Sequence, residues 1–201
     1  KIDASLFSDL KVTDEGFFDI IKLFRRSVLK GYADGTFKPK KLLTREEFVK
    51  LDLGAICIIS CDKFTTNVKK AIDTVYNLAP FPDKDITADL QYCVKEAKNR
   101  HIVSGYQGGD EAGFFLPGNN ISRAEAAKVV IETGRQQTDT ITLPQYPLNG
   151  KPWFYNYILA AQAEHLFPKG RFVQVDIFDE TTFKAWFDQQ LAQGGNEFMA
   201  W

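Results

Sequence analysis

The chain has 201 residues, a formal net charge of −1 and 44% hydrophobic residues, a composition typical of a globular protein with a buried core. The balanced charge argues against a basic nucleic-acid-binding protein. The longest mostly apolar run, Leu51 to Ile59, is far shorter than the roughly 20 residues that a membrane helix needs. We therefore expect no nucleic-acid partner and no transmembrane segment in this chain. Because the chain begins at Lys1 without Met, we expect a processed chain or a piece of a longer one.

The first predicted element is a helix over residues 17–28, where apolar residues recur at helical spacing. We expect Gly31 to stop this helix, because glycine tolerates the left-handed conformation that follows many helices. Asp34-Gly35 predicts a tight turn, and the ligand positions that would make it a calcium loop are missing.

A second helix is predicted to begin after Thr44, since Thr44 and Glu47 have the spacing of a capping box. A further helix is predicted over residues 67–77. Its expected apolar face consists of Val68, Ala71, Ile72, Val75 and Tyr76.

The three cysteines do not form a recognisable framework. Cys57 and Cys61 lie four residues apart in an apolar, helical stretch, so we interpret them as small core residues rather than redox groups or metal ligands. Cys93 stands apart from them, and His101 and His165 are too far apart in sequence for a zinc motif. We expect no metal site and no cofactor.

Internal repetition organises the chain. Two segments carry the same motifs in the same order, 74 residues apart in the first two pairs and 78 apart in the third, which an insertion of four residues in one loop explains. The matching motifs are Phe7-Ser8-Asp9 with Phe81-Pro82-Asp83, Gly31-Tyr32 with Gly105-Tyr106, and Thr44-Arg45-Glu46-Glu47 with Ser122-Arg123-Ala124-Glu125. The second copy therefore repeats the capping box, through Ser122 and Glu125. The phenylalanines of the turns, Phe37 and Phe115, are predicted to be core residues.

A third, degenerate copy is predicted from Tyr146-Pro147 onward. Gly170, Phe172 and Asp179 stand at the spacings that its turn and its second helix require. Phe172 is again expected in the core. The predicted boundaries are repeat one at 1–80, repeat two at 81–145, repeat three at 146–192 and a loose tail at 193–201.

The segment from Gly31 to Pro39, G-Y-A-D-G-T-F-K-P, followed by L-T-R-E-E-F from Leu43 to Phe48, resembles an S-layer homology repeat. That family's pattern is G-Y-x-D-G-T-F-x-P followed by I-T-R-A-E-F, and the second copy matches it in register. The resemblance implies a mainly α fold, with three tandem helix-turn-helix repeats forming a pseudo-trimeric spindle around a central helix bundle. It also implies an extracellular location at the cell wall, and non-covalent binding of cell-wall polysaccharide, often pyruvylated, in grooves between repeats.

Arg45 and Arg123 stand at the first position of their predicted helices, where a cation faces the positive end of the helix dipole at a cost of about 0.3–1 kcal/mol. A guanidinium beside spare helix N–H groups suits a carboxylate, such as a pyruvate ketal on a sugar. The alternative is that both arginines pair with a neighbouring acid and join the repeats. Glu180 replaces arginine in the third copy, so we predict at most two competent sites, built around Arg45 and Arg123, and a third that does not bind.

The resemblance extends the expected glycan-binding residues to the glycine-tyrosine pairs. For Tyr32 and Tyr106, stacking on a sugar and sealing a helix end both remain open. Trp153 fits the family's W-x-x-x-Y-I pattern, and it either lines a groove or packs in the bundle. The predicted set is Arg45, Arg123, Gly31, Tyr32, Gly105, Tyr106 and Trp153.

The sequence leaves three classes of function to compare: anchoring, structural assembly and catalysis. The first is the anchoring of a surface protein to wall polysaccharide. The second is a structural module that assembles with other surface-layer protein subunits and binds little glycan. Catalysis is not expected, because the chain has no nucleophile elbow, phosphate loop or histidine-based arrangement.

Overall fold

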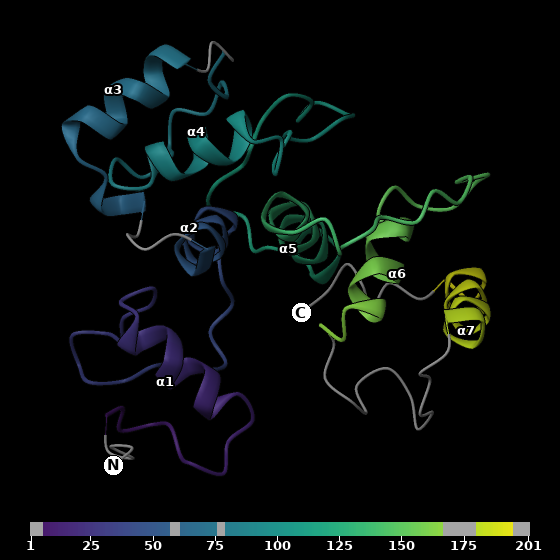
Figure 1. Ribbon diagram of the computed structural model, residues 1–201, viewed down its shortest axis with the longest axis horizontal. Helices are drawn as coiled ribbons and strands as arrows, with labels where there is room; N and C mark the ends of the chain where they lie inside the picture. Colours follow the sequence, from purple (N-terminus) through teal and green to yellow (C-terminus); the bar gives the residue numbers. More distant parts are fainter. Residues whose placement is uncertain (1–5, 57–60, 76–78, 167–179, 195–201) are drawn as a thin grey trace. The chain divides into compact units, whose positions relative to one another are not determined.

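The computed structural model describes residues 6–56, 61–75, 79–166 and 180–194. Over these ranges the chain is helical, and its β structure is limited to two isolated bridges (Figure 1). The helices are α1 (Phe17–Arg25), α2 (Arg45–Ile56), the 3-10 helix η1 (Cys61–Lys63), α3 (Thr66–Val75), α4 (Gln91–Asn99), α5 (Arg123–Gln137), α6 (Tyr155–Ala163) and α7 (Glu180–Ala192). The predicted mainly α class is confirmed. From residue 195 onward, the predicted tail lies outside the described residues.

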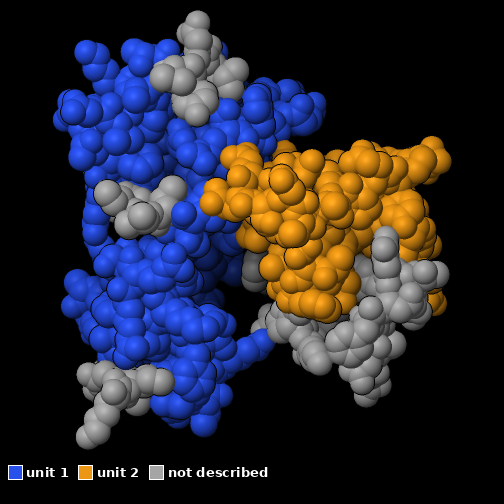
Figure 2. All heavy atoms as spheres, viewed as in Figure 1, with its two compact units in different colours: residues 1–120 blue, residues 121–201 orange. Residues whose placement is uncertain are grey.

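The chain divides into two compact units, residues 1–120 and 121–201 (Figure 2). In the first unit α2 packs against α4, and in the second unit α5 packs against α6. In both units, therefore, the second helix of one predicted repeat packs against the first helix of the next. The predicted repeat boundaries and the spindle arrangement stay predictions.

Apolar side chains form a separate core in each unit. In the first unit Phe7, Phe17 and Ile21 belong to one buried cluster, against which the partly buried Phe37 packs. Phe115 is fully buried, as predicted. In the second unit the cluster of buried residues includes Ala124, Ala127, Ile131, Phe154, Tyr155, Ile158, Leu159, Ala160, Ala161 and Phe187. Phe172, also predicted to be core, lies outside the described residues.

Three nine-residue helices, α1, α4 and α6, end in the same way. Each is followed by a non-glycine residue in the left-handed conformation: Ser27 (φ 57°), His101 (φ 58°) and His165 (φ 55°). The next residue's N–H then returns to a carbonyl of the helix, at 2.9–3.0 Å in all three cases. This recurrence supports a third repeat, which stays a prediction because Gly170 and Asp179 lie outside the described residues.

The expectation that Gly31 stops the first helix is wrong. Ser27 takes the left-handed position, and Gly31 has no positive φ. Glycine is needed at position 31 because neighbouring atoms leave no room for a side chain. A Cβ at Gly31 would lie 2.3 Å from Cε1 of Phe7 and 2.9 Å from the carbonyl oxygen of Thr36.

Both predicted capping boxes are confirmed. The Thr44 N–H donates to the Glu47 carboxylate at 3.0 Å, and the Glu47 N–H donates to the Thr44 hydroxyl at 3.3 Å. Ser122 and Glu125 make the same pair of bonds at the start of α5. These bonds satisfy backbone donors that a helix start otherwise leaves unpaired.

The additional helix is confirmed as α3, but its predicted apolar face is only partly buried. Ile72 is buried, whereas Val68 is 40% exposed and Ala71 is also exposed. Tyr76, predicted on the same face, lies outside the described residues. Of the three face residues whose side chains the structure describes, only Ile72 is therefore buried.

Cys61 is a buried core residue, as interpreted from the sequence, but the expectation that it is not a redox group is wrong. Helix α2 ends at Ile56, and Cys61 begins η1, where it forms a disulfide with Cys93 of α4. The pairing depends on the contact between η1 and α4, which sequence spacing did not reveal. Cys57 lies outside the described residues. Because disulfides form and persist in oxidising compartments, this bond agrees with an extracellular location.

Candidate functional site

A carboxylate holds the turn of the first repeat. Asp9 accepts hydrogen bonds from the backbone N–H groups of Phe37 at 2.7 Å and Lys38 at 2.8 Å. Lys38 adopts a left-handed conformation, with φ 57°. The hydrogen bond from the Phe37 N–H is the main reason that the pKa of Asp9 lies below its usual value. Asp9 thus stabilises a backbone conformation that a lysine rarely adopts.

Asp83 has the same role in the second repeat. It accepts hydrogen bonds from the N–H groups of Phe115 at 2.8 Å and Leu116 at 2.7 Å, and Leu116 is also left-handed, with φ 55°. Sequence reasoning gave neither aspartate a role. The recurrence of an aspartate two residues after a phenylalanine was the signal that could have found them.

The Gly105-Tyr106 pair lies against this second turn. Gly105 has φ 73°, and a Cβ there would lie 2.9 Å from the carbonyl oxygen of Phe114 and 3.0 Å from Cε1 of Phe81. The Tyr106 N–H donates to the Phe114 carbonyl at 2.9 Å. Glycine at position 105 therefore lets the backbone pass close to the ring of Phe81, two residues before Asp83.

Arg45 reaches this loop from the start of α2. Its side chain is buried, with the residue 8% exposed, and Nε donates to the Phe115 carbonyl at 2.7 Å. The guanidinium carbon lies 4.8 Å from the centroid of the Tyr106 ring and 5.0 Å from that of Phe115. The structure thus brings together Arg45 and Tyr106, two of the predicted glycan-binding residues, and places Gly105 next to them.

The expectation of spare N–H groups at the start of α2 is wrong. The Arg45 N–H donates to the Asn119 carbonyl at 2.9 Å, and the Glu46 N–H donates to the Pro117 carbonyl at 3.3 Å. The third N–H, that of Glu47, donates to the Thr44 hydroxyl of the capping box. The second repeat's turn occupies these donors. An anion at this point would therefore have to be recognised by side chains.

Glu46 makes a second connection between the repeats, which sequence reasoning missed. Its carboxylate accepts the N–H of Thr87 at 3.0 Å and the hydroxyl of Thr87 at 2.5 Å, and the residue is only 9% exposed. Ala124 occupies the corresponding position in the second copy. The first repeat's second helix is thereby bound to the segment that leads into α4.

The first glycine-tyrosine pair has different surroundings. The Tyr32 ring is 38% exposed, with the ammonium groups of Lys38 and Lys41 at 4.2 Å and 5.3 Å from its centroid. The hydrogen bond between Lys41 and Tyr32 raises the pKa of Lys41. Tyr32 therefore presents a partly exposed aromatic ring with two ammonium groups over its face.

The predicted tight turn at Asp34-Gly35 is confirmed. Gly35 has φ 77°, and the Tyr32 N–H donates to the Thr36 carbonyl at 2.8 Å. The Asp34 carboxylate accepts the hydroxyl of Thr36 at 2.5 Å and its N–H at 3.0 Å. The side-chain and then the backbone hydrogen bonds from Thr36 lower the pKa of Asp34 to about 2.

The remaining predicted residues belong to the second unit. Arg123 is the first residue of α5 and is partly buried. Trp153 is 47% exposed just before α6, with ring contacts to Phe154 at 5.5 Å and Tyr157 at 6.5 Å between centroids. Glu180 is the first residue of α7, the helix position that Arg45 and Arg123 hold in α2 and α5.

Among the residues that the structure describes, no group of three or more His, Cys, Asp or Glu side chains has the arrangement of a metal site. Among the described helices, none combines the length and the apolar character that crossing a membrane requires.

Comparison with known proteins identifies the two clear repeats. The family model for the S-layer homology domain matches residues 7–49 and 80–127. Cell surface glycoprotein 1 of Acetivibrio thermocellus is 33% identical to the chain over 113 residues, which cover 53% of this chain and 4% of that protein. The chain thus corresponds to a small part of this relative. No solved structure matches it.

Proposed function

We propose that the chain anchors a surface protein to the cell envelope by binding an anionic cell-wall polysaccharide non-covalently, on the premise that residues 7–49 and 80–127, which match the family model, are S-layer homology repeats. Anchoring at the cell wall is the general role of the family's domain, and it puts the module at the cell surface. The Cys61–Cys93 disulfide supports this location, because such bonds are rare in reducing compartments.

The observation that carries the proposal is the position of Arg45. Its guanidinium lies at a junction of two repeats, against the Tyr106 and Phe115 rings. Guanidinium groups bind carboxylates with paired hydrogen bonds, and an aromatic ring beside the cation offers an apolar face to a sugar. Since Arg45 is largely buried, a ligand would contact only the solvent-facing edge of the guanidinium, together with the Tyr106 ring.

Arg123 is the second residue proposed to bind the polymer. It occupies the same helix position as Arg45, one repeat further along the chain. Glu180 holds that position in α7, and its negative charge would repel a carboxylate. We therefore propose two competent sites, one at Arg45 and one at Arg123, with a pyruvate ketal as the recognised carboxylate. Gly31, Tyr32, Gly105 and Trp153 complete the proposed binding residues.

The test is co-sedimentation of the whole chain with purified cell-wall sacculi. Sacculi that keep their polysaccharide should retain the chain, and sacculi stripped of it should not. Mild acid treatment, which removes acid-labile ketals, should reduce retention at least tenfold if the ketal is the recognised group. Equal retention by native and stripped sacculi would contradict the proposal.

A second function, assembly with other surface-layer subunits, is favoured by a different observation. The Arg45 contacts join two repeats, and Trp153 and Leu166 remain 47% and 45% exposed. Exposed aromatic and aliphatic side chains are common at protein interfaces. Concentration-dependent self-association in sedimentation velocity, together with no retention by sacculi, would favour this alternative.

A further inference from the structure

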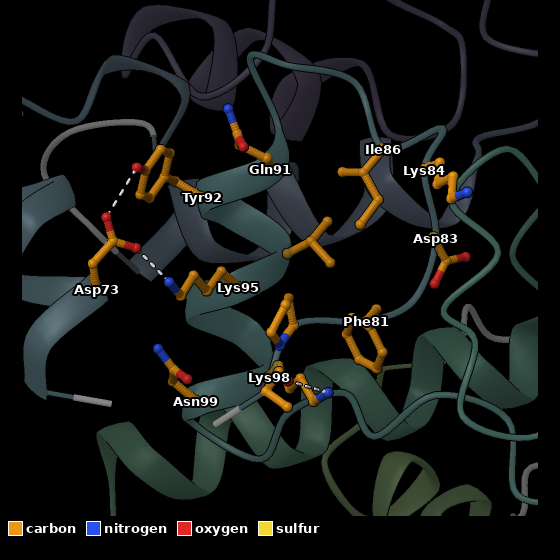
Figure 3. A pocket seen from close by; sticks show the side chains of 13 residues that line it. Asp73, Phe81, Asp83, Lys84, Ile86, Gln91, Tyr92, Lys95, Lys98 and Asn99 are labelled. Carbon is orange, nitrogen blue, oxygen red and sulfur yellow. Dashed lines mark hydrogen bonds and ion pairs between the residues drawn. The ribbon is translucent and has the colours of Figure 1, made fainter. Parts of the chain in front are cut away.

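A cavity of about 310 Å³ lies in the first unit, between α3, α4 and the segment 79–86 (Figure 3). Its size is at the lower end of the range for small-ligand sites. None of the residues predicted above to bind glycan lines it. One lining residue, Asp73, belongs to α3, the helix that is additional to the repeat pattern.

Asn99 of α4 lines this cavity and is 5% exposed. Neither its amide nitrogen nor its amide oxygen has a hydrogen-bond partner. Buried amides are nearly always hydrogen-bonded, because an unpaired one loses its bonds to water without replacement. Both amide atoms are shielded from solvent, so a ligand in the cavity would reach the donor group and the acceptor once the Asn99 side chain rotates.

The charges around the cavity favour an anion. Lys84, Lys95 and Lys98 face two aspartates, Asp73 and Asp83. Lys95 forms an ion pair with Asp73, and the Asp83 carboxylate is bound to backbone N–H groups of the second turn. Lys84 is exposed at the cavity's edge. A carboxylate would therefore find more positive than negative charge here.

Lys98 is the cation that is best placed to meet a carboxylate. Its ammonium donates to the Ala79 carbonyl at 2.6 Å and lies 4.1 Å from the centroid of the Phe81 ring. Burial lowers the pKa of Lys98, and the nearby Asp83 carboxylate partly offsets this effect. A desolvated cation attracts an anion more strongly than one in bulk solvent does.

Much of the remaining lining is apolar, although Gln91 and Tyr92 also contribute to it. Pro80, Phe81, Ile86 and Val94 form a hydrophobic wall beside the amide and ammonium groups. A sugar ring has the matching character, with apolar C–H faces and hydroxyl groups around its edge. A carboxylate on such a ring would use the excess positive charge.

We propose that this cavity binds one carboxylated sugar unit, with its carboxylate at Lys84 and Lys98 and its hydroxyl groups at the Asn99 amide. The choice of a sugar rests on the proposed function, whereas the choice of a small carboxylate rests on the cavity alone. The cavity would act as a site additional to those at Arg45 and Arg123.

The test is NMR titration of the ¹⁵N-labelled whole chain with glucuronic acid, and with glucose as its neutral counterpart. Glucuronic acid should shift the Asn99 side-chain NH₂ signals and those of Lys98 and Phe81. Its affinity should exceed that of glucose at least fivefold. No shift at the cavity up to the solubility of the acid, or equal affinities for both sugars, would overturn the proposal.

Three variants separate binding from folding. Asn99→Leu should abolish binding while the thermal midpoint stays equal or rises, because the variant removes an unpaired buried amide. Lys84→Ala should weaken binding at least threefold. Lys70→Ala removes an exposed α3 lysine outside the cavity and should change neither property. Unchanged binding in a folded Asn99→Leu chain would overturn the proposal.

Sacculus binding distinguishes this proposal from the function on which it rests. If native sacculi retain the chain but glucuronic acid leaves the cavity signals unshifted, the cavity proposal fails and the anchoring function stands. If the acid occupies the cavity but sacculi do not retain the chain, anchoring fails and the cavity remains a site for a small carboxylate.

Discussion

The side chain of Arg45 donates from Nε to the carbonyl oxygen of Phe115, 70 residues further along the chain, at 2.7 Å. The donor begins the second helix of the first repeat, and the acceptor lies in the turn of the second repeat. One residue therefore helps to join two repeats and also supplies the cation proposed to recognise the polymer. Its removal should affect folding as well as binding.

Arg45→Ala should destabilise the chain by about 2–3 kcal/mol, because it removes a buried hydrogen bond from a charged donor and leaves the Phe115 carbonyl unpaired. Arg45→Lys should recover only part of the loss, since lysine lacks the planar group that stacks on Tyr106. Urea unfolding measures both effects. Lys22→Ala, at an exposed position, is the control. A change below 0.5 kcal/mol for Arg45→Ala would contradict the structure.

Gly31→Ala should destabilise the chain by about 1–3 kcal/mol through overpacking, because the new Cβ would meet the Phe7 ring and the Thr36 carbonyl. Gly118→Ala is the matched control, since nothing lies within 4 Å of a Cβ there and no positive φ is involved. Thermal unfolding of the two variants should therefore differ clearly. Equal midpoints would mean that Phe7 moves aside without cost.

Reduction of the Cys61–Cys93 disulfide should lower the free energy of unfolding by about 2–4 kcal/mol, as expected for a bond that closes a segment of 32 residues. Calorimetry with and without a reducing agent measures this loss. The Cys93→Ser variant should unfold at the reduced protein's midpoint and be insensitive to the reductant. A wild-type midpoint that does not change on reduction would show that the bond is absent in solution.

The Asp34 turn should lose stability in acid. The pKa of Asp34 is lowered from 3.8 to about 2 in the folded chain, so its ionised form is favoured by folding. The stabilisation is therefore fully present above about pH 4 and is lost as the pH falls toward about 2. Asp34→Asn should flatten the pH dependence of urea unfolding over this window. An identical slope in both proteins would refute the assignment.

Local signals in the sequence predicted the helices and both capping boxes. The Thr44–Glu47 and Ser122–Glu125 pairs act within four residues, so their geometry follows from spacing alone. The helix start at Glu180 was predicted from repetition instead, because Glu180 aligns with Arg45 and Arg123 of the first two copies.

Contacts between distant segments escaped prediction. The Cys61–Cys93 bond depends on how η1 meets α4, and the helical spacing of Cys57 and Cys61 pointed to a continuous helix instead. Sequence spacing also does not show that backbone carbonyls of the second repeat's turn accept hydrogen bonds from the N–H groups at the start of α2. For the candidate site, the sequence named Arg45 and Tyr106, and the structure added the contact between them.

The most direct test of the central claim is retention on native sacculi of the wild-type chain, Arg45→Ala, Arg123→Ala and the double variant. All four are measured at a temperature at which circular dichroism shows them folded. Each single variant should bind more weakly, and the double variant should lose at least tenfold in affinity. A folded double variant that binds as tightly as the wild type would show that these arginines only join the repeats, and it would contradict the account.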